Sequence, residues 1–338
     1  MEKKRPNWRK RVLWNVSITI LLLIGTVIGY GVYLTDQAKK AADQAHQELD
    51  RGELSDKREK NITPGMDNIS VLFVGVDDSE TRTDQGNPRS DALILATFNA
   101  ENKSVKLLSI PRDSYVYIPV EGKKDKITHA HAFGGINATV ETVEEALDIP
   151  VDYYVRLNFE AFTEVVDSLD GIYYDVPFDI QEQNSKDEQN AIYIEEGLQH
   201  LDGEEALALA RTRKYDSDLE RGKRQVEIVK AIFSKATTIT SVSKYDDIIR
   251  SVGNNMKTNL SFDQMLSFRD FALDKDVKFE SLQLEGQGVY INQVYYFQLE
   301  DENVKDVQLE LKHHLGIEPS NISTLANTKG VRSINKEG

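Results

Sequence analysis

The chain of 338 residues contains no cysteine, which excludes disulfide bonds, thiolate metal sites and a cysteine nucleophile. Positive charge is also scarce, because 41 Lys and Arg stand against 56 Asp and Glu and give a formal net charge of −15 at pH 7. Nucleic-acid binding requires a broad basic face. This balance and the lack of a helix-turn-helix pattern therefore argue against a nucleic-acid partner and a role in transcription. The sequence also contains no internal repeat.

An uncharged apolar run occupies residues 12–34. As a helix it would be about 34 Å long, which is enough to cross a bilayer. Six Lys and Arg residues precede it, so residues 1–11 are predicted to stay in the cytoplasm as a basic tail. A cleaved signal peptide is the alternative, but the run is longer than a usual signal-peptide core and no A-x-A site directly follows it. The sequence therefore predicts a single-pass protein of the cell membrane, with the remaining residues outside the cell.

The rest of the chain divides by composition. Residues 35–69 are polar, lack aromatic side chains and are interpreted as a stalk, and residues 319–338 as a flexible tail. Between them, over 70–318, short apolar runs alternate with helical patterns, which predicts an α/β sandwich around one central sheet. Strands are predicted at 70–76, 92–98, 105–110, 116–119, 152–157 and 172–177, and helices at 135–148, 158–171 and 202–211, with helical periodicity through 219–275.

One stretch departs from the acidic character of the chain: "RTRKYDSDLERGKRQ" at 211–225 holds six cations. Arg211 and Arg213 leave the end of one predicted helix, and "SDLE" at 217–220 reads as a capping box that starts the next. On that helix Arg221, Arg224 and Gln225 share a face. Because the guanidinium group binds phosphate oxygens bidentately, the cluster indicates a site for a small anion. The alternative is a solvated helix face that pairs with Asp216 and Asp218.

Charged residues also gather at the ends of three predicted strands. Asp77 and Asp78 follow the first strand, "RSD" at 89–91 begins the second, and Arg112 and Asp113 follow the third. Ligands bind at such strand ends in α/β folds, and Mg²⁺ takes one or two carboxylates together with phosphate oxygens. Any one of these acids alone would more often be a turn residue or a cap.

Four histidines lie in two further stretches of the sequence. His129 and His131 in "KITHAHAFGG" are spaced for one face of a strand, but no third ligand accompanies them, so structural or substrate-edge roles are favoured over a metal site. Lys126 in the same stretch could reach a phosphate. The pair His313 and His314 is interpreted as lying on a helix surface.

Together these stretches resemble the LytR–CpsA–Psr family of cell-wall enzymes. The resemblance covers roughly residues 68–235, through "NISVLFVGVDD", "RSDALILATFN", "LLSIPRDSYVYIP", "KITHAHAFGG", "LDGIYYDVP", "EGLQHLDGEEALALARTR" and "DLERGKRQ". It implies an α/β domain outside the membrane, with a central mixed β-sheet flanked by helices. It also implies transfer of an anionic glycopolymer, by default wall teichoic acid, from an undecaprenyl-pyrophosphate carrier to peptidoglycan.

The resemblance also implies roles for individual residues. Asp77 and Asp91 correspond to the acids that hold Mg²⁺, with Mn²⁺ as an alternative metal. The pyrophosphate-binding residues are Arg112, Arg211, Arg213, Arg221 and Gln225, and Arg89 is a further phosphate contact. Arg224 has no counterpart with a known role, and Asp78 is left unassigned because the segment after Asp77 varies in length among relatives.

The implied reaction is attack of a muramic-acid C6 hydroxyl on the phosphorus attached to the glycopolymer, with undecaprenyl phosphate leaving. Charge neutralisation and positioning account for such a transfer, and no protein nucleophile is needed. Arg112 is thus predicted to act on the reacting phosphate, and the general base is Asp91 or Asp113. The lipid requires an apolar groove, which "FEAFTEVV" and "VEIVKAIF" could line, although such helices more often pack in a core.

Two other functions remain open from the sequence. A pyrophosphatase would release undecaprenyl phosphate with water in place of the sugar acceptor. A prenyl-phosphate-binding scaffold of the cell envelope would need the arginines but not the strand-end acids. Product formation that depends on the acceptor would separate the transferase from both.

Overall fold

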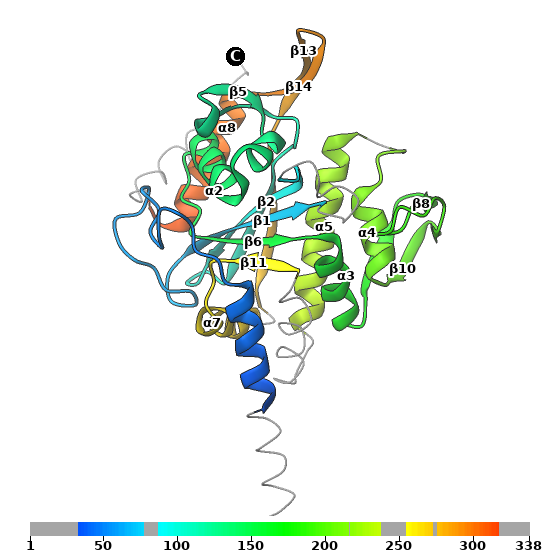
Figure 1. Ribbon diagram of the computed structural model, residues 1–338, viewed down its shortest axis with the longest axis horizontal. Helices are drawn as coiled ribbons and strands as arrows, with labels where there is room; N and C mark the ends of the chain where they lie inside the picture. The colour runs from blue at the N-terminus through cyan, green and yellow to red at the C-terminus, as the bar shows by residue number, and fades with distance from the viewer. Residues whose placement is uncertain (1–32, 78–86, 216, 238–254, 273–275, 318–338) are drawn as a thin grey trace, which may run out of the picture.

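The computed structural model describes residues 33–77, 87–215, 217–237, 255–272 and 276–317 (Figure 1). The predicted cytoplasmic tail 1–11, all but the last two residues of the predicted anchor 12–34, Asp78, and the predicted tail 319–338 lie outside these residues. Within the described ranges, no helix combines the length and the apolar character that crossing a membrane requires.

A six-stranded sheet forms the centre of the fold, in the order β11-β6-β1-β2-β3-β12. The β1–β6 and β3–β12 pairs are parallel and the other pairs antiparallel, so the predicted mixed sheet is confirmed. The strands are β1 (Ile69–Val76), β2 (Ser90–Asn99), β3 (Ser104–Ser109), β6 (Tyr153–Leu157), β11 (Met256–Thr258) and β12 (Lys278–Gln283).

Helices cover both faces of this sheet, because alternate residues of β1 enter two different cores. Leu72 and Val74 belong to the core that α2 (Thr128–Leu147) and α8 (Asp301–Leu315) complete. Ile69 and Val71 belong to the core shared with α5 (Asp218–Thr237) and α7 (Phe262–Ala272). Figure 1 shows α2 and α8 on one side of the sheet and α3 (Phe159–Ser168), α4 (Gly203–Arg211) and α5 on the other.

The smaller strands form paired ribbons around this centre. They are β4 (Tyr115–Ile118) with β5 (Lys123–Lys126), β7 (Ile172–Val176) with β10 (Gly197–Leu201), β8 (Ile180–Glu182) with β9 (Ile192–Ile194), and β13 (Gly286–Ile291) with β14 (Val294–Leu299), and a 3-10 turn, η2 (Pro119–Glu121), follows β4. The strands predicted at 116–119, 152–157 and 172–177 are confirmed as β4, β6 and β7.

Two local predictions were wrong. "KITHAHAFGG" does not form a strand, because α2 begins at Thr128, where the hydroxyl donates to the Ser90 carbonyl at 2.6 Å. The helix continues across a kink at Gly134 and Gly135. The helical pattern predicted through 219–275 is also interrupted, since the three-residue strand β11 pairs with β6 at the edge of the sheet.

The segment predicted as a stalk packs on the domain. Residues 33–45 form a helix whose Ala38 and Ala42 are buried against Phe262 of α7. Further along, Leu49 enters the main core and Arg58 forms a buried ion pair with Asp152. The folded unit therefore begins well before the predicted boundary at residue 70. The partners of these side chains lie far away in the sequence, so the sequence pattern gave no sign of the packing.

The interpretation of the histidine pair on α8 also changes. His313 is exposed as expected, but His314 is buried with a hydroxyl 2.8 Å from each ring nitrogen, Thr97 at Nδ1 and Ser104 at Nε2. Burial, followed by the positive charge of Lys106, lowers the pKa of His314 from 6.5 to about 4. The folded state therefore holds this ring neutral.

We expect His314 to make stability depend on pH below neutrality. Its pKa is lower in the folded chain than in the unfolded chain, so its contribution is complete above pH 6.5 and is lost as pH falls towards 4. The loss is up to about 3 kcal/mol. Urea unfolding measured across this window should show that the free energy of unfolding depends less steeply on pH in His314→Gln than in the unchanged chain. The control His313→Gln changes the exposed neighbour and should leave this slope unaltered. Equal slopes for all three would contradict the assignment.

Candidate active site

The strand-end charges meet at one edge of the central sheet. Residues paired between β2 and β3 include Ile94 with Ser109, and continuing this register past the strands places Arg112 opposite Asp91. Arg112 Nη1 indeed donates to Asp91 Oδ1. Asp77 follows β1, the other neighbour of β2, so it belongs to the same edge. The predicted grouping of strand-end charges is therefore present.

A β-bulge accompanies Asp91. Val76 pairs with Ser90 and Gly75 with Ala92, which leaves Asp91 as the extra residue on β2. Bulges near active sites commonly redirect a side chain. Asp91 both pairs with Arg112 and lines the large cavity described below.

The arginine stretch forms the corner between α4 and α5. The predicted helix start is confirmed, because α5 begins at Asp218 and the Glu220 N–H donates to the Ser217 hydroxyl. This is one half of the predicted capping box, and the Glu220 carboxylate accepts from Lys223 Nζ. Arg224 is buried and donates from Nε to the Leu209 carbonyl at 2.8 Å and from Nη2 to the Thr212 carbonyl at 2.7 Å. Arg224 thus holds the end of α4, a structural role that the sequence left unassigned.

Gln225 contributes to the same corner. Its Nε2 donates to the Ala210 carbonyl at 3.1 Å, and the side chain also lines the large cavity. One of its two amide N–H groups is therefore bonded to α4, and its predicted contact with pyrophosphate stays a prediction.

Arg221 is a buried cation close to other cations. It is only 4% exposed, and its Nη2 lies 2.8 Å from Asp218 Oδ1. Burial is the main cause that lowers the pKa of Arg221 to about 10, and the charges of Arg213 and Arg112 lower it further. Asp218 and Asp91 oppose this shift. Three cations therefore lie within electrostatic range of one another in a poorly solvated place.

Buried donors at this site lack a partner. Arg112 Nε, Arg211 Nη1 and Arg221 Nε are buried, and they donate to no acceptor among the described residues. An unpaired buried N–H is costly, and mutual repulsion adds to that cost. An anion would relieve both, so the donor set fits a phosphate or pyrophosphate group.

Arg211 also stacks on the Phe159 ring, with its guanidinium carbon 4.2 Å from the centroid. Arg213 and Arg89 are less enclosed. Arg213 Nε lies 3.9 Å from Asp218 Oδ1. Arg89 is exposed just before β2, and no hydrogen bond or ion pair within the described part of the chain joins it to the cluster. The sequence analysis named Phe159 only as part of the lipid-lining run "FEAFTEVV", and its stacking with Arg211 was not predicted.

Asp113 is the second candidate base. Its Oδ1 lies 2.9 Å from Lys126 Nζ, because the Ile127 and Thr128 N–H groups bond to the carbonyls of Ser114 and Arg112 and draw the two segments together. Asp91 and Asp113 thus each face a cation, and both remain candidates.

The donor set at the strand ends suits Mg²⁺ only in part. Asp77 is buried and Asp91 is partly exposed at the adjoining strand. Within the ranges that the structure describes, no group of three or more His, Asp or Glu side chains is placed to hold a metal. Two carboxylates match a Mg²⁺ ion whose remaining ligands are substrate phosphate oxygens and water.

The two histidines of α2 have protein partners. His131 Nδ1–H donates to the Pro88 carbonyl at 2.6 Å, and His129 Nδ1 lies 3.0 Å from Asp125 Oδ2. His131 and Thr128 therefore fix the segment 88–90 that leads into Asp91. This agrees with the favoured structural role.

An apolar cavity of about 430 Å³ opens beside the charged cluster. Asp91, Arg211 and Gln225 line it together with apolar residues from the sheet and from α3, α5 and α7. Both predicted lipid-lining runs take part: "FEAFTEVV" through Phe159, Phe162 and Val165, and "VEIVKAIF" through Ile228, Val229, Ile232 and Phe233. A polar end and an apolar body are what an amphipathic lipid phosphate requires.

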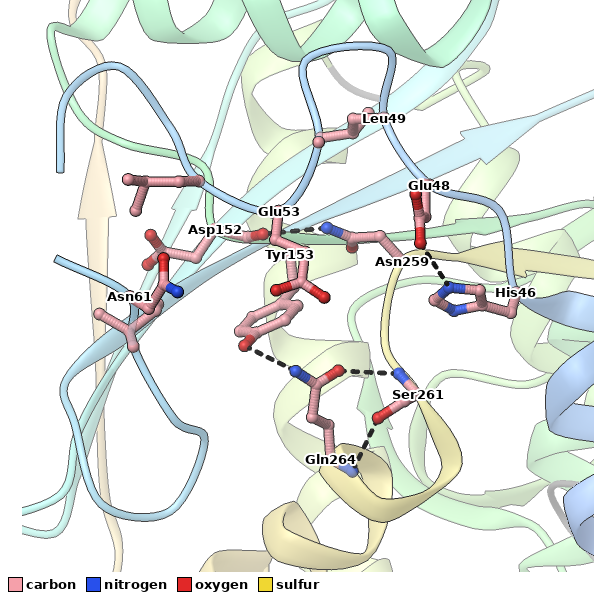
Figure 2. A pocket seen from close by; sticks show the side chains of 13 residues that line it. His46, Glu48, Leu49, Glu53, Asn61, Asp152, Tyr153, Asn259, Ser261 and Gln264 are labelled. Carbon is pink, nitrogen blue, oxygen red and sulfur yellow. Dashed lines mark hydrogen bonds and ion pairs between the residues drawn. The ribbon is translucent and has the colours of Figure 1, made fainter.

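A second cavity, of about 130 Å³, lies between residues 46–62, β6 and α7 (Figure 2). Its polar groups bond to one another: Gln264 Nε2 donates to the Tyr153 hydroxyl at 3.2 Å, and Asn259 Nδ2 to the Asp152 carbonyl at 3.0 Å (Figure 2). None of the predicted site residues lines it. This cavity lies where the N-terminal segment packs on the domain.

Substituting the two buried arginines of α5 is expected to affect different properties: stability for Arg224 and lipid binding for Arg221. Arg224→Met should lower the free energy of unfolding by about 2–3 kcal/mol, because two carbonyls at the end of α4 lose a charged donor. Arg221→Met should change the free energy of unfolding by less than about 1 kcal/mol, since removing a desolvated and repelled cation offsets the lost pair with Asp218. The same substitution should weaken binding of a prenyl pyrophosphate at least about tenfold. Urea unfolding and lipid titration measure the two effects, and the reverse pattern would contradict these assignments.

Comparison with known proteins places these features in a family. The LytR_cpsA_psr family model matches residues 32–313. The chain is 44% identical over 319 residues, 94% of this chain and 97% of the relative, to polyisoprenyl-teichoic acid–peptidoglycan teichoic acid transferase TagT of Bacillus subtilis strain 168. A solved structure of TagT bound to LI-WTA matches with a TM-score of 0.70 and 44% identity, covering 80% of this chain and 100% of that one.

A further TagT structure, with bound octaprenyl pyrophosphate lipid, matches with a TM-score of 0.66 and 42% identity over 80% of this chain and 100% of that chain. The matched region includes the sheet edge, the α4–α5 corner and the helices around the large cavity. The chain therefore belongs to the LytR–CpsA–Psr family.

Proposed function

We propose that this protein is a membrane-anchored phosphotransferase that moves an anionic glycopolymer, wall teichoic acid, from an undecaprenyl-pyrophosphate carrier to peptidoglycan. The observation that carries the proposal is the set of buried guanidinium donors of Arg112, Arg211 and Arg221, which lack an acceptor in the part of the chain that the structure describes, beside an apolar cavity of about 430 Å³. The names of the relatives as teichoic acid transferases and the octaprenyl pyrophosphate bound to TagT support it. The anchor is the apolar run 12–34.

The residues of the site divide the work. The prenyl chain lies in the cavity, and the arginines bind the pyrophosphate oxygens as charge develops on them. The attacking C6 hydroxyl of muramic acid forms a bond to the phosphorus that bears the glycopolymer, while the bond from that phosphorus to the bridging oxygen breaks and undecaprenyl phosphate leaves. The hydroxyl proton passes to the carboxylate of Asp91 or Asp113.

A divalent ion belongs to this proposal. Asp77 and Asp91 would hold Mg²⁺, or Mn²⁺, which would neutralise phosphate charge when bound. The pair Arg112–Asp91 then also orients one metal-binding carboxylate.

The full chain in lipid nanodiscs tests the proposal. It is incubated with an undecaprenyl-pyrophosphate-linked glycopolymer, peptidoglycan oligomers and Mg²⁺, and mass spectrometry detects a phosphodiester-linked conjugate. The conjugate is expected only when donor, acceptor and metal are all present. Undecaprenyl phosphate released without conjugate would indicate the pyrophosphatase, and lipid binding without any turnover would indicate the scaffold.

A further inference from the structure

The hairpin of β13 and β14 projects from the fold at the top of Figure 1. Its base is joined to the active-site segment, because the Phe297 N–H donates to the Asp113 carbonyl at 2.8 Å and Phe297 itself is buried. Near its tip, Tyr290 is 76% exposed and Tyr295, its partner across the hairpin, is 38% exposed. Large exposed aromatic rings on an anchored ribbon commonly mark a binding surface.

These rings continue towards the candidate base. The ring centroids of Tyr290 and Tyr295 are 5.6 Å apart. Lys126 Nζ, which pairs with Asp113, lies 5.9 Å from the Tyr295 centroid and 5.7 Å from that of Tyr296. A row of side chains, Tyr290, Tyr295 and Lys126, therefore runs from near the hairpin tip to the carboxylate of Asp113.

Tyr295 is held in one place. A Cβ added to Gly288 would lie 2.7 Å from the Tyr295 ring, so this ring packs directly on the glycine backbone. Burial, followed by the carboxylates of Asp113 and Asp218, raises the pKa of Tyr295. The ring thus lies within electrostatic range of the candidate base and of the carboxylate that pairs with Arg221.

The row offers both polar groups and apolar surfaces. The Lys126 ammonium and the hydroxyls of Tyr290 and Tyr295 are the polar groups, and the ring faces are the apolar ones. Hydroxyl-rich sugars combine such polar edges with apolar C–H faces, and a tyrosine ring offers a matching apolar face with a polar tip.

The in-line geometry of phosphoryl transfer indicates which substrate would bind beside the hairpin. In phosphoryl transfer the attacking and leaving oxygens are roughly in line across the phosphorus. The leaving prenyl phosphate extends into the 430 Å³ cavity, whose lining includes Asp91 and Arg211 but not Asp113, Lys126 or the hairpin. The acceptor hydroxyl must therefore arrive from a different side, and Asp113 with the hairpin provides one.

We propose that Tyr290 and Tyr295, together with Lys126, form the subsite that binds the saccharide acceptor. The inference rests on the proposed function for the identity of that saccharide, a peptidoglycan glycan strand. Lys126 would also attract the carboxylates that such strands carry.

Direct binding tests this subsite apart from turnover. The full chain in nanodiscs is titrated with an uncrosslinked peptidoglycan tetrasaccharide and, separately, with octaprenyl pyrophosphate. Tyr290→Ala and Tyr295→Ala are each expected to weaken tetrasaccharide binding about tenfold and to leave octaprenyl-pyrophosphate binding unchanged. Gly288→Ala, which displaces the Tyr295 ring, should act like Tyr295→Ala, and Tyr290→Phe should retain most of the affinity.

Tyr193→Ala is the matched control, because Tyr193 is 58% exposed on β9. β9 pairs with β8, which Figure 1 shows at the right of the fold, away from the hairpin. It should behave as the unchanged chain. Tetrasaccharide affinity that is equal in the control and in both hairpin variants would overturn the proposal. So would a loss confined to an octaprenyl-pyrophosphate-linked disaccharide, which would make the hairpin a site for the donor glycan. Tetrasaccharide binding that depends on the tyrosines, without conjugate formation, supports the subsite and contradicts only the proposed transfer.

Discussion

Replacing Arg112 with alanine is expected to lower the rate of glycopolymer transfer about a thousandfold, the range seen when one charged donor to a transferring phosphoryl group is lost. Arg112 combines a buried N–H that lacks a partner among the described residues with an ion pair to Asp91. Its removal takes away transition-state charge stabilisation and also frees a carboxylate that would hold the metal. The initial rate of conjugate formation at saturating donor and acceptor measures the effect.

The controls separate chemistry from folding. Arg112→Lys keeps the charge but not the two-pronged donor geometry, so we expect it to recover only part of the rate. Lys223→Ala removes an exposed cation that pairs with Glu220 on the same helix α5 and should leave the rate within about twofold. Retention of the full rate in Arg112→Ala would remove Arg112 from the mechanism.

Replacing Arg58 with alanine is expected to destabilise the whole domain by about 3–5 kcal/mol. Arg58 and Asp152 are only 6% and 3% exposed, and two hydrogen bonds of 2.7 and 2.8 Å join them. Asp152 also accepts the Ser70 N–H at the start of β1, so a carboxylate left unpaired would disturb the central sheet. Urea unfolding of the chain in detergent measures the loss.

The matched control is a surface ion pair in the same segment. Lys60 pairs with Asp67 at the surface, and Lys60→Ala should cost less than about 1 kcal/mol. A fragment that starts at residue 61 loses Arg58 and Leu49 together and should be less stable than one that starts at residue 33. Equal stability of Arg58→Ala and Lys60→Ala would mean that the N-terminal segment is a stalk after all.

Much of the fold follows from local patterns. The apolar runs of β1, β2 and β3 indicated strands buried on both faces, and they form the middle of the sheet. The cap of α3 was also readable, since the Asn158 side chain accepts the Ala161 N–H at 2.9 Å. Such signals depend on residues close in sequence, and so no tertiary information is needed.

Other elements have no local signal. β11 has three residues and exists because its backbone completes the edge of β6. The first turns of α2 hold the segment before Asp91 through Thr128 and His131, and a two-residue histidine spacing could not reveal this. The helix at 33–45 has a polar composition and packs through small alanines.

For the site, the sequence alone was enough to specify the chemistry: acids at strand ends, arginines around a capping box, and apolar runs for a lipid, because residue type and spacing decide which groups can bind which ligand. The tertiary structure decided how these groups are used. Arg221 and Arg224 lie one turn apart on the same helix. Arg221 has a buried Nε–H that finds no acceptor within the described ranges, whereas Arg224 donates to two carbonyls at the end of α4. The difference comes from the neighbours that chain packing supplies, since the position of α4 places two carbonyl acceptors beside Arg224. Arg221 instead lies in electrostatic range of two other arginines and of the carboxylates of Asp218 and Asp91.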